Sequence, residues 1–315
     1  MCGIVGCLDW SGAHRPDEGL LRRMLTTIRH RGPDEFGVYV DDKLGMGSAR
    51  LSIIDLNTGQ QPICNEDQSL WIVFNGEIFN YVELRAELVQ RGHRFSTQSD
   101  TEVILHLYEE LGPECLQQLN GQFAIAIWDT HRESLFLARD RLGIRPVFYA
   151  PLPQGLVFGS EIKAILLDER IPARLDPYAL AQTFTFWAPL APRTVFQGIE
   201  ELRPGHYMLV TKAGRTVSQY WSLEFPPAGE EAKMTEGEAA EQLRALLSDA
   251  TRLRLRADVT VGSYLSGGLD SSLIVALMAE QKPSTLRTYS IGFAAAGGEE
   301  GNEFRYSDLI AKKFG

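Results

Sequence analysis

A cysteine at position 2 is the first residue whose place in the chain could do chemistry. Cys2 follows only the initiator methionine, which is commonly removed when the next side chain is as small as cysteine. The mature chain would then begin with a thiol and carry its own base, because an α-amino group with a pKa of roughly 7.7 to 8.0 is partly neutral near pH 7. That amine can take the thiol proton directly or through a water. Taken alone, a cysteine at this position is more often without a role, so its neighbours must decide.

A second candidate is the run Ser266-Gly267-Gly268-Leu269-Asp270-Ser271-Ser272, which lies between a β-rich segment and an apolar helix. A strand that enters a helix through a glycine-rich turn presents unpaired N–H groups and the positive end of the helix dipole, which suits a phosphate. The lysine and the spacing of a Walker A loop are absent. The alternative is an ordinary helix start with serine and aspartate caps.

Several ordered blocks of sequence resemble the class II glutamine amidotransferase domain of the asparagine synthetase family, from Cys2 to about Trp221. The resemblance implies the α+β fold of N-terminal nucleophile hydrolases, an αββα sandwich of two antiparallel sheets with helices outside. The blocks are Met1-Cys2-Gly3-Ile4-Val5-Gly6, His30-Arg31-Gly32-Pro33-Asp34, Arg50-Leu51-Ser52-Ile53-Ile54-Asp55, Phe74-Asn75-Gly76-Glu77-Ile78, Ser99-Asp100-Thr101-Glu102, Asn120-Gly121-Gln122-Phe123-Ala124 and Arg139-Asp140-Arg141-Leu142-Gly143-Ile144-Arg145-Pro146.

The resemblance implies that Cys2 is the nucleophile of a glutaminase. Hydrolysis of a side-chain amide passes through a tetrahedral oxyanion, and each hydrogen-bond donor placed there contributes about 2.7 to 4 kcal/mol. The Asn75 side-chain amide and the Gly76 backbone N–H match the family's pair of donors. An Asn-Gly pair is also typical of a type I′ hairpin turn, which is the alternative for these two residues.

Recognition of free glutamine requires that both its α-carboxylate and its α-ammonium be bound. The resemblance assigns the carboxylate to Arg50, in a bidentate contact, and the ammonium to Asp100 with help from Glu77. Backbone groups around Ile53, from Leu51 to Ile54, complete the implied pocket. Without the resemblance, Arg50 would be taken as a surface residue and Asp100 as a helix cap.

The serine-glycine run resembles the pyrophosphate loop of ATP pyrophosphatases, which release pyrophosphate and transfer AMP. The resemblance implies that ATP and Mg²⁺ bind here, with Asp270 as a ligand of the Mg²⁺ that bridges the phosphates, a role suited to a carboxylate. It also places an adenine nucleotide against Leu265 and Ile291, at the ends of adjacent strands, where open α/β sheets usually bind ligands. The implied ATP-binding set is Leu265, Ser266, Gly267, Gly268, Asp270, Ser271, Ser272 and Ile291.

The two resemblances together predict a glutamine-dependent amide ligase. Ammonia released by Cys2 would amidate a carboxylate that ATP has adenylated, and in asparagine synthetases that carboxylate belongs to aspartate. Relatives that amidate other acids remain an alternative, since the block Ile63-Cys64-Asn65-Glu66-Asp67 is at least as similar to those. A glutaminase-only or non-catalytic fragment is a further alternative. The expected partners are glutamine, ATP and aspartate, with a homodimer expected because dimers are common among relatives.

Composition excludes several other classes of function. The 315 residues carry a net charge of −10 with a sequence pI of about 5.2, which argues against binding to a nucleic-acid backbone. No apolar stretch approaches the ~18 residues of a membrane span, and the start lacks the pattern of a signal peptide. Four cysteines in a chain of this length do not form a disulfide scaffold and are expected to act as thiols. A cytoplasmic location is therefore expected.

Hydrophobic periodicity and turn signals predict the elements that must position these residues. Helices are expected over 17–28, from Asn80 to Gly92, from Ser99 to Gly112, from Thr235 to about Leu253, over 271–279 and at the end of the chain. Strands are expected over 70–74, 123–129, 134–139, 147–149, 156–158, 259–265 and 286–293. Capping boxes are expected at Asn80 with Glu83, Ser99 with Glu102 and Thr235 with Glu238.

A break in composition divides the chain. The segment from Pro226 to Glu231 is rich in proline, glycine and charge and is expected to be a linker. We expect a glutaminase domain over 1–217, and over 218–315 a linker followed by the beginning of a parallel α/β ATP-pyrophosphatase domain. Because a nucleotide-binding sheet needs more strands than the two predicted here, this second domain is expected to be truncated.

Overall fold

The computed structural model describes residues 2–281, 286–293 and 302–314, so Met1 and Gly315 lie outside the described residues. The chain divides into two compact units, Met1–Glu224 and Phe225–Gly315, which are described separately. The boundary expected after residue 217 falls inside the last strand of the first unit, just before this division.

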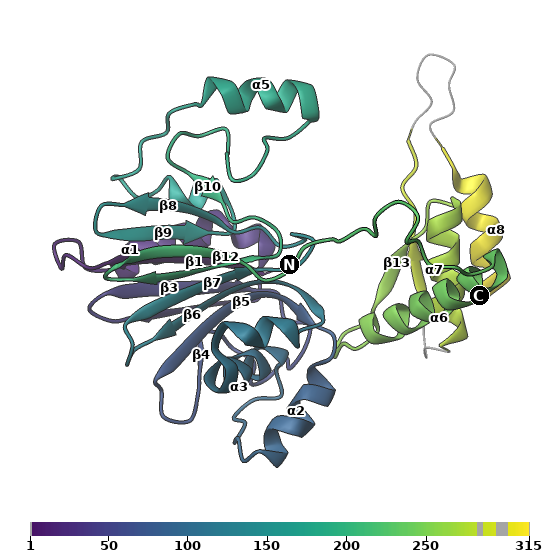
Figure 1. Cartoon of the computed structure of the whole chain (residues 1–315), viewed down its shortest axis with the longest axis horizontal. Helices are drawn as coiled ribbons and strands as arrows, with labels where there is room; N and C mark the ends of the chain where they lie inside the picture. The colour runs from purple at the N-terminus through teal and green to yellow at the C-terminus, as the bar shows by residue number, and fades with distance from the viewer. Residues whose placement is uncertain (1, 282–285, 294–301, 315) are drawn as a thin grey trace. The chain divides into compact units, whose positions relative to one another are not determined.

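Two six-stranded antiparallel sheets form the first unit (Figure 1). The first has the order β10-β8-β9-β1-β3-β2 and the second the order β12-β11-β7-β6-β5-β4. The first sheet consists of β1 (Gly3–Asp9), β2 (Glu35–Val40), β3 (Leu44–Arg50), β8 (Phe148–Leu152), β9 (Gly155–Gly159) and β10 (Glu200–Glu201). The second consists of β4 (Ile63–Cys64), β5 (Leu70–Ile78), β6 (Gly121–Asp129), β7 (Ser134–Arg139), β11 (His206–Thr211) and β12 (Gly214–Gln219).

Helices cover the outer faces of both sheets. On the first sheet lie α1 (Glu18–Thr27) and α4 (Ile162–Ile165), on the second lies α3 (Asp100–Leu111), and α2 (Tyr81–Gln90) packs against α3. The short 3-10 helices η1 (Arg29–Arg31) and η2 (Gly112–Gln117) follow α1 and α3, and α5 (Pro177–Phe186) stands apart from the sheets (Figure 1).

Three buried layers confirm the expected αββα sandwich. Ile4, Leu8, Val73 and Trp128 belong to the layer between the sheets, while two further clusters fill the spaces between each sheet and its helices. Every residue of β1 is buried, because one of its faces meets the other sheet and the other face meets α1. The helix approaches β3 closely enough that a Cβ at Gly45 would lie 2.7 Å from the Leu21 side chain.

The helix starts confirm one predicted capping box in full. Thr235 and Glu238 cap each other reciprocally, as expected. Ser99 caps α3 through the Thr101 N–H, but the Glu102 carboxylate binds Ser96 and Thr97 instead of reaching back. The capping box predicted at Asn80 is wrong. Its side chain instead joins two backbone groups of a neighbouring segment, the Gln118 carbonyl and the Asn120 N–H, which leaves the start of α2 without a side-chain cap.

The second unit is a small parallel α/β arrangement. It contains α6 (Glu236–Arg254), β13 (Gly262–Tyr264), α7 (Leu269–Glu280), β14 (Arg287–Tyr289) and α8 (Phe304–Phe314). The strands β13 and β14 pair in parallel, which confirms the expected topology, although both are shorter than the sequence predicts. In the part of the chain that the structure describes, no helix combines the length and apolarity needed to cross a bilayer.

Candidate active site

The Cys2 side chain lies at the start of β1, which is an inner strand of its sheet. Its Sγ accepts a hydrogen bond from the Leu51 N–H at 3.3 Å and faces the Leu51 carbonyl at 3.6 Å, while Arg31 Nε donates to the Cys2 carbonyl at 2.9 Å. Burial raises the pKa of the thiol, and the Leu51 N–H and the Arg50 charge offset part of this rise. The thiol is therefore fixed in place and needs a base before it can react.

Asn75 and Gly76 lie inside β5, opposite Ala124 and Phe123 of β6, so the type I′ turn considered from the sequence is wrong. Asn75 is fully buried, and neither its side-chain nitrogen nor its side-chain oxygen has a hydrogen-bond partner among the described residues. A buried amide without a partner is costly in a stable fold, so it points to a binding role. Asn75 shares the face of Val73, which packs between the two sheets.

The backbone N–H groups of Phe74, Gly76 and Ile78 point toward the same edge of β5. Alternate residues of a strand direct their N–H groups to the same side. The Phe74 N–H donates to Gln61 Oε1 at 2.7 Å, and the Ile78 N–H donates to Asp100 Oδ2 at 2.9 Å. Gly76 lies between these two residues. A Cβ at Gly76 would lie 2.1 Å from the Gln122 carbonyl oxygen, which explains why glycine is required here.

Arg50 is a buried arginine at the end of β3. Its Nη2 donates to the Ile54 and Asp55 carbonyls at 2.9 and 2.6 Å, and its Nη1 donates to Glu35 at 2.9 Å. The guanidinium therefore holds the loop that follows β3 in place. The bidentate contact expected with a carboxylate would require Arg50 to release Glu35.

Asp100 is the first residue of α3, and Ser99 rather than Asp100 caps this helix. Burial and the neighbouring Glu77 charge raise the pKa of Asp100 to about 6, while the Ile78 N–H lowers it less. The group is therefore a buried carboxylate that ionises just below neutral pH.

A small cavity of about 30 Å³ brings most of the expected glutamine site together. Its volume is enough for about two water molecules. Asn75 is absent from the lining, although the adjacent Gly76 is part of it. The lining residues are Cys2, Arg50, Leu51, Ile53, Ile54, Gln61, Phe74, Gly76, Glu77, Ser99, Asp100 and Thr101.

Sequence reasoning missed residues that support this cavity. Gln61 bridges the Phe74 N–H and the Thr101 hydroxyl, to which its Nε2 donates at 3.3 Å. Arg31 holds the Cys2 backbone, and burial together with the Arg31 charge lowers the pKa of Arg145. Arg31 and Arg145 belong to sequence blocks that resemble the family, and this resemblance could have pointed to them. Gln61 had no such signal.

The serine-glycine run forms the turn between β13 and α7, as expected. Gly268 is the N-cap of α7, and Gly267 has a φ of +88°, which favours glycine. The Ser266 Oγ and Ser271 Oγ lie 3.0 Å apart, and Ser266 Oγ accepts from the Gly268 N–H at 3.2 Å. Asp270 is exposed in the first turn of α7. The hydroxyl of Ser272 is buried and without a partner in the described part of the chain.

A cavity of about 300 Å³ adjoins this turn. The buried Leu265 and the exposed Ile291, which the sequence places beside an adenine nucleotide, both line it, together with Ser266. The remaining lining combines four aromatic side chains with three polar ones: Tyr264, Tyr289, Phe293 and Phe304, and Ser290, Glu303 and Ser307. The other members of the expected ATP-binding set lie outside the lining, in the turn before α7 and in its first turn: Gly267, Gly268, Asp270, Ser271 and Ser272.

A sandwich of two antiparallel sheets, with a buried thiol at the start of an inner strand, defines the N-terminal nucleophile hydrolase fold. Two solved structures share this fold at 18% sequence identity. Glutamine phosphoribosylpyrophosphate amidotransferase from B. subtilis aligns with a TM-score of 0.51 over 92% of this chain and 65% of that chain. The allosteric regulatory enzyme of purine biosynthesis aligns with a TM-score of 0.53 over 94% of this chain and 67% of that chain.

The chain belongs to the glutamine amidotransferase domain family, whose model matches residues 1–221, and residues 242–315 match the asparagine synthase family model. Among curated proteins, asparagine synthetase (glutamine-hydrolyzing) 3 of Bacillus subtilis is 40% identical over 300 residues, covering 93% of this chain and 48% of that protein. Asparagine synthetase (glutamine-hydrolyzing) 1 of the same organism is 39% identical over 95% of this chain and 47% of that protein. The chain therefore spans about half the length of these relatives.

Proposed function

We propose that the first unit hydrolyses glutamine to glutamate and ammonia, with Cys2 as the nucleophile once Met1 is removed. One observation carries this proposal. The Cys2 thiol, the Gly76 backbone, Arg50 and Asp100 border one cavity, and the adjacent Asn75 holds a buried amide donor without a partner among the described residues.

The proposed reaction proceeds through a thioester. The α-amino group of Cys2 takes the thiol proton, and the sulfur attacks the side-chain amide carbon of glutamine. The Asn75 amide and the Gly76 N–H stabilise the resulting oxyanion. The nitrogen then accepts a proton and leaves as ammonia when the C–N bond breaks. Water hydrolyses the thioester, which releases glutamate and restores the thiol.

Glutamine would be selected by its two backbone charges. Asp100 with Glu77 would bind the ammonium, and Arg50 would bind the carboxylate through Nη1 after releasing Glu35. The loop from Leu51 to Ile54, which has neither helix nor strand, forms one wall of the glutamine cavity.

Glutamate release by the full chain tests the nucleophile. Cys2→Ala should abolish release, because no other thiol borders the cavity in the described part of the chain. Cys64→Ala is the matched control: this half-buried thiol in β4 is absent from the cavity lining, so release should stay near the wild-type rate. Normal release by Cys2→Ala would contradict the assignment.

For the second unit we propose ATP-dependent activation of a carboxylate. ATP would lie in the cavity beside Leu265 and Ile291, with its phosphates at the start of α7. The turn suits phosphate because it leads into the N-terminus of α7 and the buried Ser272 hydroxyl lacks a partner among the described residues. A bound Mg²⁺ would neutralise phosphate charge, with Asp270 as its carboxylate ligand.

Aspartate is the acceptor that we propose, with asparagine, AMP, pyrophosphate and glutamate as products of the overall reaction. The support is the match to the asparagine synthase family and to the curated relatives. The four free thiols fit a reducing compartment, so we place the activity in the cytoplasm. The homodimer stays a prediction, which sedimentation of the full chain would check.

Binding of ATP to the full chain tests the nucleotide site. We expect Mg²⁺ to strengthen binding in the wild type, and Asp270→Asn to remove most of that strengthening while leaving Mg²⁺-free binding unchanged. Asp258→Asn, an aspartate of the same unit outside the turn and the cavity lining, is the control. An equal Mg²⁺ effect in Asp270→Asn would contradict the metal role, and no ATP binding at all would contradict the site.

A further inference from the structure

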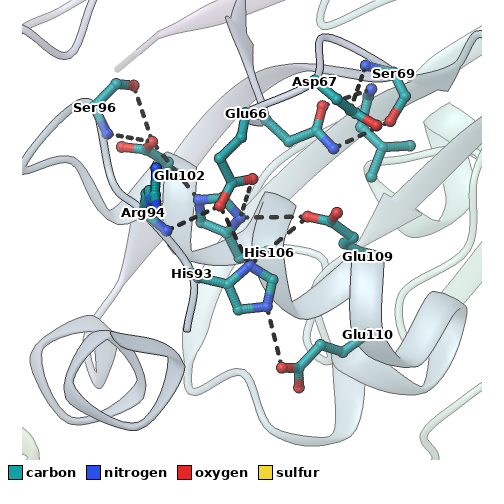
Figure 2. Close-up of polar contacts among 12 residues, drawn as sticks. Glu66, Asp67, Ser69, His93, Arg94, Ser96, Glu102, His106, Glu109 and Glu110 are labelled. Atoms are coloured by element: carbon teal, nitrogen blue, oxygen red, sulfur yellow. Dashed lines mark hydrogen bonds and ion pairs between the residues drawn. The ribbon is translucent and has the colours of Figure 1, made fainter. Parts of the chain in front are cut away.

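Two histidines and two glutamates converge on the outer side of the second sheet, away from the glutamine cavity (Figure 2). Glu66 lies in the loop between β4 and β5, and His93 lies in the loop between α2 and α3. His106 and Glu109 lie one turn apart on α3. Three separate segments of the chain therefore contribute one side chain or more to the same point.

The spacing of the four side chains matches the ligands of a tetrahedral metal. His106 Nδ1 lies 3.4 Å from Glu109 Oε2 and 3.6 Å from Glu66 Oε2. His93 Nδ1 lies 3.7 Å from Glu66 Oε1 and 3.8 Å from Glu109 Oε2. All four ligand atoms lie within 4.8 Å of one another. Zinc bound at about 2.0 to 2.1 Å by four ligands places those ligands about 3.3 Å apart, so the four histidine–glutamate pairs are close to this spacing and the widest pair must contract by up to about 1.5 Å.

A second set of carboxylates lies on the Nε2 side of the two imidazole rings. His93 Nε2 is hydrogen-bonded to Glu110 Oε1 at 3.1 Å, whereas His106 Nε2 faces Glu102 Oε1 at 3.7 Å and has no hydrogen-bond partner among the described residues (Figure 2). Each ring thus turns its Nε2 toward a carboxylate and its Nδ1 toward the centre of the cluster. Histidines that bind metals usually direct their other nitrogen to a carboxylate in this way.

The outer carboxylates are themselves held in place. Arg91 Nη1 donates to Glu110 at 2.6 Å. Glu102 is almost fully buried and accepts hydrogen bonds from the Ser96 and Thr97 backbone N–H groups, both at 2.7 Å. The His93 ring is therefore oriented before any ligand arrives, which lowers the entropic cost of binding.

Burial and charge also favour a cation at this point. His106 is fully buried, with the His93 and Phe95 rings each 4.6 Å from its own ring. Around the two imidazoles stand the carboxylates of Glu66, Glu102, Glu109 and Glu110, and within the described residues Arg91 is paired with just one of them. A divalent cation at the centre would offset this excess of negative charge.

We propose that Glu66, His93, His106 and Glu109 form a structural zinc site. Two imidazole nitrogens with two carboxylates favour zinc over calcium or magnesium, which prefer oxygen ligands alone. Four protein ligands make the site closed and therefore structural. The zinc would tie α3 to two loops, and α3 begins at Asp100 in the glutamine cavity, so the metal would steady one wall of that cavity.

Metal binding to the chelator-treated full chain tests the proposal. We expect one Zn²⁺ per chain, bound with a dissociation constant on the order of 1 μM or tighter in competition with a chromophoric chelator. Co²⁺ in place of zinc should give the intense visible absorption of a tetrahedral site. Zinc should also raise the thermal midpoint of the wild type.

Single substitutions distinguish zinc bound at this cluster from zinc bound elsewhere on the chain. His93→Gln and Glu109→Gln, chosen because both side chains reach the surface, should lose the zinc, the Co²⁺ band and the zinc-dependent midpoint shift. Glu110→Gln should weaken zinc binding by about 10- to 100-fold. The exposed His131→Gln and the thiol variant Cys2→Ala should bind zinc as the wild type does.

Four outcomes would overturn the zinc site. The first is no zinc uptake by the wild-type chain. The second is uptake that survives in both His93→Gln and Glu109→Gln. The third is uptake that disappears in Cys2→Ala, which would place the metal on the thiol. The fourth is a thermal midpoint that changes with pH and with the His93 substitution but does not respond to zinc. Protonation of the histidines would then account for the cluster.

Discussion

At the scale of single residues, Asp100 destabilises the empty fold near neutral pH but is suited to bind the substrate. Its carboxylate is buried beside Glu77, so the folded chain holds the proton of Asp100 up to about pH 6, well above the ordinary value of 3.8. Above that pH the fold must accommodate a buried negative charge. The ammonium of the proposed substrate would relieve this cost, so the residue that weakens the empty fold is suited to strengthen the complex.

We predict that Asp100→Asn stabilises the chain near pH 7 and weakens glutamine binding. The pKa of Asp100 is about 6 in the folded chain and 3.8 in the unfolded chain. Protonated Asp100 therefore contributes its whole stabilising effect below pH 3.8, and this effect is lost as the pH rises through 6. Two pKa units correspond to at most about 2 to 3 kcal/mol. In urea unfolding, the free energy of unfolding of Asp100→Asn should therefore increase relative to that of the wild type as the pH rises from about 4 to 7.

The same substitution should raise the KM for glutamine at least about tenfold, because a neutral amide attracts an ammonium less than a carboxylate does. The wild-type KM should rise below pH 6, where Asp100 is protonated, and this dependence should be absent in Asp100→Asn. Asp17→Asn, at the exposed cap of α1, is the control and should leave KM unchanged. A wild-type KM in Asp100→Asn would rule out the ammonium role.

At the scale of elements, β5 combines structural and chemical tasks in one strand. Its N–H groups hold Gln61 at Phe74 and Asp100 at Ile78, and the Gly76 N–H lies on the same edge between them. On its other side, β5 pairs with β6 so closely that position 76 has no room for a Cβ. The proposed oxyanion donor and the start of α3 therefore depend on the register of a single strand pair.

We predict that Gly76→Ala disrupts this strand pair. The new methyl group would meet the Gln122 carbonyl at 2.1 Å, and backbone cannot yield as a flexible side chain can. The expected cost is about 1 to 3 kcal/mol in urea unfolding, with a large loss of kcat for glutamate release. Gly237→Ala is the control, because its Cβ would meet nothing within 4 Å in α6, where alanine should instead add up to about 1 kcal/mol. Wild-type stability in Gly76→Ala would refute the steric argument.

Elements with strong periodicity could be predicted from the sequence, and those stabilised by packing could not. Helix α1 follows from its apolar stripe, and Ser134–Arg139 was predicted residue for residue. Strand β3 was missed because Leu44-Gly45-Met46-Gly47-Ser48 has few β-branched or aromatic residues. Its glycines have a role only once α1 packs against them, which is a tertiary effect. Helix α5 was also missed, although Asp176 caps it.

The sequence could likewise predict only part of the candidate site. The family blocks located the residues that surround the cavity, but the partners of Arg50 and the bridging role of Gln61 depend on loops whose paths the sequence does not encode locally. The cluster around His106 had no sequence signal, because its four side chains come from three segments without a regular spacing. Folding brings these groups together, so only the structure could reveal the cluster.

At the scale of the whole molecule, the two compact units have separate cores joined by an exposed segment. The residues from 222 to 235 form neither helix nor strand, and each of them is exposed. The first unit contains every residue proposed to handle glutamine, and the second contains the whole serine-glycine turn. Because few contacts cross such boundaries, each unit is expected to keep its own chemistry when the segment is cut.

We predict that a lysine-specific protease cuts the native chain at Lys233 before it cuts at Lys43, Lys163 or Lys212. Lys233 lies in the exposed segment, whereas Lys43, Lys163 and Lys212 lie in or beside paired strands and helices that resist cleavage. Mass spectrometry should identify an early fragment that ends at Lys233, and this fragment should release glutamate at the rate of the intact chain. Lys233→Gln should delay the cut without changing the rate of the intact enzyme. A fragment that ends at Lys233 but has lost glutamate release would mean that the first unit depends on the second for its activity, and the separation of chemistry between the units would then be wrong.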